Sequence, residues 1–101
     1  MNELERVIEG VNKFGIPEHL KEVIIEYVYR GRPTGGFLEA IFSNDLVGAF
    51  GRADFESMEG NPEIVKWLYN KAPMGCHGSS ERFLSWLREG GLKGLTEGEN
   101  E

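Results

Sequence analysis

The residues whose types could do chemistry are concentrated in the middle of the chain. On a helix, Asn44, Gly48 and Arg52 are spaced four residues apart and therefore share one face. Gly48 carries no side chain, so it leaves a notch between an amide and a guanidinium group. A ligand or another backbone could enter this notch. The alternative is that the glycine only allows close helix packing, with Arg52 paired to Asp45 or Asp54.

An anion-binding helix start is the second feature of this segment. Thr34 is predicted to cap a short helix that begins with two glycines, where free backbone N–H groups and the helix dipole favour negative charge. Three arginines lie nearby in sequence, and a phosphate-bearing small molecule would suit such a pocket. The spacing is not that of a phosphate loop or of a dinucleotide fingerprint. The predicted ligand-binding residues are Arg30, Arg32, Thr34, Gly35, Gly36, Asn44, Asp45, Gly48 and Arg52.

The adjacent pair Cys76 and His77 is the candidate for nucleophilic catalysis. A nucleophilic cysteine needs a base within hydrogen-bond reach, and neighbouring residues rarely face each other in that way. With one cysteine and two histidines in the chain, a metal site would also need carboxylates. We therefore predict no catalytic residue, no bound metal and no cofactor, and expect Cys76 to pack in a loop between two helices.

Two other groups of side chains have a functional and a structural interpretation. Glu18, Glu22 and Glu26 form a stripe that could bind a divalent cation, although a solvated helix face is the simpler interpretation. Tyr29 and Tyr69 could hold a planar base by stacking. The alternative is that both tyrosines are half-exposed parts of the core.

The elements that must position these residues are all helical. Asn2 and Ser79 or Ser80 are predicted caps, and Gly31 is a predicted helix end. Helices are expected over residues 3–13, 17–30, 34–42, 45–52, 61–72 and 79–89, the fifth starting at Asn61-Pro62-Glu63. The last is expected to bury Phe83, Leu84, Trp86 and Leu87. No segment alternates with period two, so we predict an all-α, compact bundle of five or six short helices.

Length and composition set the remaining limits. A chain of 101 residues suits one domain, and we predict a helical domain over residues 1–93 and a disordered acidic tail over residues 94–101. The net charge of −6 argues against general binding to nucleic acid. No apolar run approaches the roughly 18 residues of a membrane span, and the acidic start does not resemble a secretory signal. We therefore expect a cytoplasmic protein.

Several short motifs resemble a group of small proteins of bacteriophages and prophages. The resemblance covers residues 17–92, and the group is mostly uncharacterised. It implies a phage source, and therefore the cytoplasm of a host cell, without implying a mechanism. The group commonly has an aromatic residue at the Cys76-His77 position, which weakens a Cys–His dyad. The motifs are Gly35-Gly36-Phe37-Leu38, Ser43-Asn44-Asp45-Leu46, Arg52-Ala53-Asp54, Trp67-Leu68-Tyr69-Asn70, Cys76-x-Gly78-Ser79 and Trp86.

Three functions from different classes follow as hypotheses. The first is a non-enzymatic phage accessory protein that binds a small anionic ligand and sequesters a nucleotide immune signal. The second is an acidic inhibitor that binds a host or defence protein and predicts an exposed acidic or apolar patch. The third is a small hydrolase using Cys76 and His77. A homo-oligomer is compatible with all three, because a small domain gains stability by assembly.

Overall fold

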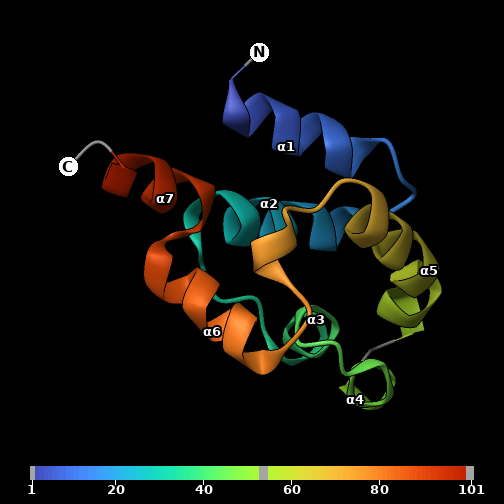
Figure 1. The fold of residues 1–101 in the computed structure, drawn as a ribbon. Helices are drawn as coiled ribbons and strands as arrows, with labels where there is room; N and C mark the ends of the chain where they lie inside the picture. The colour runs from blue at the N-terminus through green and yellow to red at the C-terminus, as the bar shows by residue number, and fades with distance from the viewer. Residues whose placement is uncertain (1, 53–54, 100–101) are drawn as a thin grey trace.

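The computed structural model describes residues 2–52 and 55–99, and every regular element within these ranges is helical (Figure 1). The predicted all-α fold is confirmed, and the described ranges hold seven α-helices rather than the five or six expected. A 3₁₀ helix, η1, lies between the fifth and sixth. The helices are α1 (Glu3–Asn12), α2 (Glu18–Arg30), α3 (Gly36–Phe42), α4 (Leu46–Arg52), α5 (Phe55–Asn70), η1 (Met74–Cys76), α6 (Ser80–Glu89) and α7 (Gly91–Glu99).

Most predicted helix ends are confirmed by their hydrogen bonds and dihedral angles. The Asn2 side chain accepts from the Glu5 N–H at 2.8 Å, and the Ser79 hydroxyl accepts from the Arg82 N–H at 3.1 Å. Each satisfies an amide that has no partner within its helix. Gly31 ends α2 in the left-handed region, with φ of 69°, where a side chain would be strained.

The predicted start of the fifth helix is wrong. The sequence predicts a start at Asn61-Pro62-Glu63, whereas α5 begins at Phe55 and carries Pro62 in its interior. A proline inside a helix costs about 3 kcal/mol because it lacks a donor and crowds the preceding turn. Packing offsets this cost after the proline, because Ile64 and Trp67 are almost completely buried.

The disordered tail predicted from residue 94 is replaced by helix α7 through Glu99, and residues 100 and 101 lie outside the described ranges. Close contact between two helix ends makes this possible. A Cβ atom on Gly31 would lie 2.6 Å from the Gly91 nitrogen, and one on Gly91 would lie 2.6 Å from the Gly31 nitrogen. Two glycines at the same point therefore let α7 pack against α2.

The core is built around α2, which crosses the middle of the molecule with α1 above it, α5 at the right, α6 and α7 at the left, and α3 below it in this view (Figure 1). Tyr27 on α2 is completely buried and contacts two other rings. Its ring centroid lies 4.4 Å from that of Phe42 and 5.2 Å from that of Phe83, and Phe42 meets Trp67 edge-on at 6.1 Å. Burying one such side chain contributes about 1.5–3 kcal/mol.

Leu84 departs from the predicted core, since 53% of its surface is exposed. Helical residues advance by about 100° each. Phe83, Trp86 and Leu87 therefore share the inner face of α6, while Leu84 is turned outward. Leu84 is therefore an apolar side chain of α6 that lies at the protein surface rather than in the core.

Candidate functional site

The predicted arginine pair lies at the C-terminal end of α2 and is already neutralised in part. Nη1 of Arg30 lies 2.6 Å from one oxygen of the Glu26 carboxylate, and Nε of Arg32 lies 3.0 Å from the other. The Arg30 guanidinium also lies over the Tyr29 ring, 5.2 Å from its centroid. Cations are favourable at this end of a helix because the dipole is negative there. One carboxylate therefore binds both arginines, and the pair has a structural role without any ligand.

The start of α3 differs from the prediction by one residue. Gly35, not Thr34, occupies the N-cap position, and its φ of 96° suits a residue without a side chain. The Thr34 hydroxyl donates to the Gly35 carbonyl at 3.1 Å, so it does not cap the helix amides. Apart from its two chain neighbours, no described residue has an atom within 4 Å of the position that a Gly35 Cβ would occupy, so this end of α3 is open.

The notch predicted at Gly48 is filled from within the chain. Asp45 accepts a hydrogen bond from the Gly48 N–H at 2.9 Å, and a Cβ on Gly48 would overlap the Asp45 carboxylate. Asn44 lies before α4 in a left-handed conformation, with φ of 65°. The prediction that Asn44 shares a helical face with Gly48 is therefore wrong. Arg52 ends α4, and its side chain lies outside the described residues.

Four of the nine predicted site residues fall into two separate groups. Arg30 and Arg32 gather around Glu26, while Asp45 and Gly48 form a local cap at the start of α4. Over residues 2–52 and 55–99, no hydrogen bond or ion pair joins the two groups. Arg32 does line a surface hollow of about 340 Å³, whose other described residues are Glu18, His19, Glu22, Val23, Glu26 and Pro33. This hollow is acidic, in contrast to the positive pocket that was predicted.

The glutamate stripe of α2 is engaged in ion pairs at both ends. Glu18 binds Lys21 at 2.9 Å, and Glu26 binds the two arginines. Among the residues that the structure describes, no three His, Cys, Asp or Glu side chains converge in a group that could hold a metal ion. The stripe therefore contributes salt bridges to the helix surface.

Cys76 is buried in η1, as predicted, and its thiol is poorly suited to nucleophilic attack. Burial raises the pKa of the thiol to about 12, so the thiolate is scarce at neutral pH. Burial, together with the positive charge of Arg82, lowers the pKa of His77. Both residues are therefore neutral at pH 7. A thiolate–imidazolium pair does not form under these conditions.

The residues that sequence inspection missed are the partners of this loop in the core. The Tyr27 hydroxyl donates to the Cys76 carbonyl at 2.7 Å, and the Trp86 indole N–H donates to the Tyr27 carbonyl at 2.9 Å. The Gly78 N–H donates to the Phe42 carbonyl at 2.9 Å. No sequence spacing connects these positions. The signal in the sequence was the presence of several Tyr and Trp side chains, whose O–H or N–H group needs a hydrogen-bond partner when it is buried.

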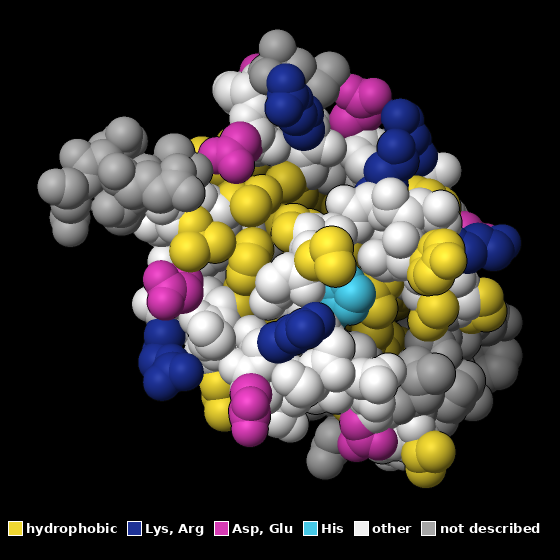
Figure 2. All heavy atoms as spheres, in the orientation of Figure 1, with side chains coloured by type: hydrophobic (Ala, Val, Ile, Leu, Met, Phe, Trp, Pro, Cys, Tyr) yellow, Lys and Arg dark blue, Asp and Glu magenta, His cyan; other side chains and the backbone are white. Residues whose placement is uncertain are grey.

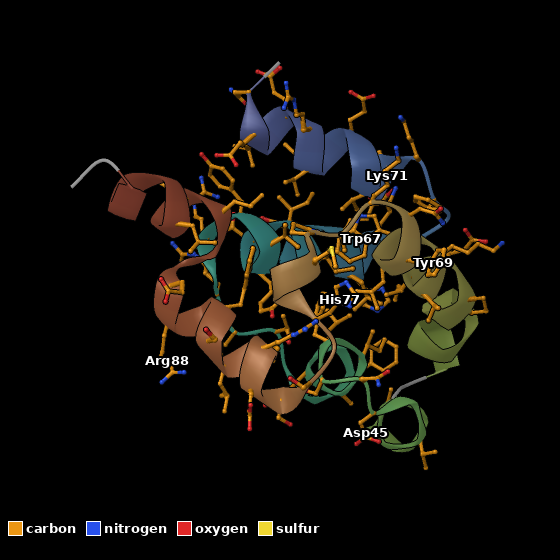
Figure 3. The ribbon with its side chains drawn as sticks, in the orientation of Figure 1. Asp45, Trp67, Tyr69, Lys71, His77 and Arg88 are labelled. Carbon is orange, nitrogen blue, oxygen red and sulfur yellow. The ribbon has the colours of Figure 1, made fainter. Side chains whose placement is uncertain are left out.

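Large hydrophobic side chains are also exposed on the surface. Tyr69 and Met74 are 89% and 81% exposed, and Val47 on α4 is 87% exposed. The prediction that Tyr69 is half buried in the core is therefore wrong. Tyr69 lies in the last turn of α5, and three residues separate the end of that helix from Met74, where η1 begins. Figure 2 shows hydrophobic side chains on either side of a histidine over this part of the molecule, and Figure 3 labels it as His77.

Within the described ranges, no helix combines the length and the apolar character needed to cross a membrane. Comparisons with protein families, with curated proteins and with solved structures found no match for this chain.

Proposed function

We propose that this protein acts without catalysis, by binding another protein through the surface formed by Tyr69 and Met74. The exposure of these two side chains carries the proposal. Tyrosine and methionine are enriched where protein partners meet, because both offer a large apolar area and adapt to the surface opposite. Two such side chains five residues apart can anchor one segment of a partner.

The charges around this surface indicate the chemistry of the partner. Lys71 lies between Tyr69 and Met74 in sequence, with its side chain beside Gly10 of α1. Arg82 donates to the carbonyl of His77, three residues after Met74, at 3.4 Å. In the described part of the chain, neither Lys71 nor Arg82 has an acidic partner. A partner segment with an apolar side chain flanked by acidic groups would complement this surface. The resemblance to phage proteins suggests that the partner belongs to the host.

Cross-linking in bacterial cells tests the proposal directly. A photoreactive benzoylphenylalanine replaces Tyr69 in one variant and Val47 in another. The second is the matched control, because Val47 is equally exposed but lies on α4. We expect a protein adduct from position 69 and none from position 47. The adduct should be lost when Met74→Ser is added. Identical adducts from both positions, or none from position 69, would show that this surface does not bind a partner.

The small anionic ligand predicted from the sequence is the second candidate. Two observations favour it: 67% of the Arg32 side chain is exposed, and the start of α3 at Gly35 is open. The shared carboxylate of Glu26 weakens it, because a ligand must compete for both arginines. Calorimetric titration with linear and cyclic nucleotides separates the two functions. Binding that disappears in Arg32→Ala and Arg52→Ala, at unchanged melting temperature, would favour the anionic ligand.

A further inference from the structure

The outer face of α6 carries an exposed leucine between two opposite charges. Glu81, Leu84 and Arg88 follow one another at intervals of three and four residues, so they lie on the same face of the helix. Together with Leu87 they line a hollow of about 520 Å³. Figure 3 shows Arg88 on the outer side of α6, away from the body of the molecule.

Neither charge on this face has an ion-pair partner among the residues that the structure describes. Four Lys and Arg side chains elsewhere in the described ranges pair with an acidic group three or four residues away, as Lys13 does with Glu9 and Lys66 with Glu63. Neither the Glu81 carboxylate nor the Arg88 guanidinium has such an ion pair in the part of the chain that the structure describes. They are seven residues apart, about 10 Å along the helix, which is too far for a direct pair.

The charges on this face of α6 are complementary to those of a second copy only when the two helices run antiparallel. The midpoint between positions 81 and 88 falls between Leu84 and Ser85. If a second α6 packs antiparallel about a two-fold axis at this midpoint, each Glu81 lies opposite Arg88 of the other copy, and the two Leu84 side chains meet near the axis. A parallel arrangement would place like charges opposite each other. We propose that two copies of this chain associate antiparallel through Glu81, Leu84 and Arg88 of α6.

A second copy fits this face better than an unrelated protein does. The opposite charges are placed symmetrically about a central apolar residue, which is the requirement of an isologous interface. The face is also distinct from the surface of Tyr69 and Met74, so this proposal does not depend on the proposed function. One helix face buries less than the roughly 800 Å² per partner of a standard interface. We therefore expect a weak dimer, with a dissociation constant on the order of 0.1 mM.

Charge reversal in an analytical ultracentrifuge tests the proposal. The wild-type chain should approach the dimer mass as its concentration rises from about 10 µM to about 1 mM, as mass action at that affinity requires. The proposed dimer has two facing charge pairs, because position 81 of each copy lies opposite position 88 of the other. In a dimer of the Glu81→Arg variant alone, or of the Arg88→Glu variant alone, both pairs consist of like charges. We expect each variant to associate at least about tenfold more weakly, since charge pairs placed in this way become repulsive.

An equimolar mixture of the two variants provides the decisive measurement. In the mixed dimer, the new arginine at position 81 faces the new glutamate at position 88, and the two native charges also face each other. The mixture should therefore recover the wild-type association. Glu89→Arg is the matched control, because it makes the same charge change at an exposed position on another face of α6. Its association should match that of the wild type.

Three results would overturn the proposal. A wild-type chain that stays monomeric up to about 1 mM would exclude the dimer at the affinity expected for a face of this size. Single variants that dimerise as the wild type does would place the interface elsewhere. A mixture that remains as weak as its components would show that the two charges do not pair. Circular dichroism melting of each variant confirms that α6 is folded, which is expected because all the substituted positions are exposed.

Discussion

Two connecting regions of this chain use their polar groups in opposite ways. Between α2 and α4, the hydrogen bonds of the polar side chains join close neighbours, as Thr34 does with Gly35 and Asp45 with Gly48. Between α5 and α6, a loop with few polar side chains is bonded to distant parts of the core, because the Cys76 carbonyl accepts from Tyr27. In the region predicted to bind a ligand, the polar side chains are hydrogen-bonded to close neighbours. The loop between α5 and α6, which has few polar side chains, is bonded to the core.

The difference shows how misleading a cluster of polar residues can be in a short chain. Contacts between neighbours cost little loop entropy, so Asx turns and caps form wherever the residue types allow them. The polar groups held in these turns and caps are then not available to bind a ligand. A long-range bond such as that from Tyr27 to Cys76 forms only if packing has already brought the two residues together. The following predictions test this contrast between local and long-range contacts.

The largest effect is expected at the contact between α2 and α7. Gly31→Ala introduces a Cβ 2.6 Å from the Gly91 nitrogen, at a φ of 69° that already disfavours a side chain. We expect the free energy of unfolding to fall by about 3 kcal/mol, measured by urea denaturation. Gly35→Ala is the control, because its φ is also positive but its surroundings are open. It should lose about 1 kcal/mol. Equal losses would argue against a tight contact between these helix ends.

The buried hydrogen bond to η1 should have the next largest effect. Tyr27→Phe removes the donor and leaves the Cys76 carbonyl without a partner in the core. We expect a loss of about 2 kcal/mol in the free energy of unfolding, since an unsatisfied buried acceptor loses its hydration as well as its bond. Tyr69→Phe is the matched control, because that side chain is 89% exposed. A change within about 0.5 kcal/mol is expected there. Similar losses at both positions would contradict a structural role for the bond.

The buried thiol makes stability depend on alkaline pH. Because its pKa is raised to about 12 in the folded protein, Cys76 holds its proton more tightly there than in the unfolded chain, whose ordinary value is near 9.0. The stabilisation is complete below pH 9 and is lost as the pH rises from 9 toward 12. The slope from this group is at most about 1.4 kcal/mol per pH unit. Urea denaturation at pH 8, 9 and 10 should show the decline, and Cys76→Ala should reduce it. An identical decline in the variant would assign the effect to other groups.

The smallest effect is expected at the local cap of α4. Asp45→Ala removes the acceptor of the Gly48 N–H, and we expect a loss of about 1 kcal/mol by urea denaturation. Asp45→Asn keeps an oxygen that can accept the same bond, so it should retain most of the stability. A loss as large as that from Tyr27→Phe would show that Asp45 does more than cap its own helix.

Much of the helical structure follows from short-range signals. Asn2, Gly31 and Ser79 marked helix ends correctly, because capping and left-handed ends depend on residues within one turn. Pro62 misled the prediction of α5, since the local cost of an interior proline is outweighed by the burial of Trp67. The candidate site was predicted less well, because which charges remain available depends on partners such as Glu26.

The sequence by itself determined the helical class and most of the helix ends, since both depend on residue type and spacing over a few positions. Tertiary structure decided the rest. It brought Gly31 against Gly91, and it bonded Tyr27 to the Cys76 carbonyl. It also left Leu84 and Tyr69 at the surface rather than in the core. Periodicity identifies an apolar face, but only the packing of the other helices determines how much of that face is covered.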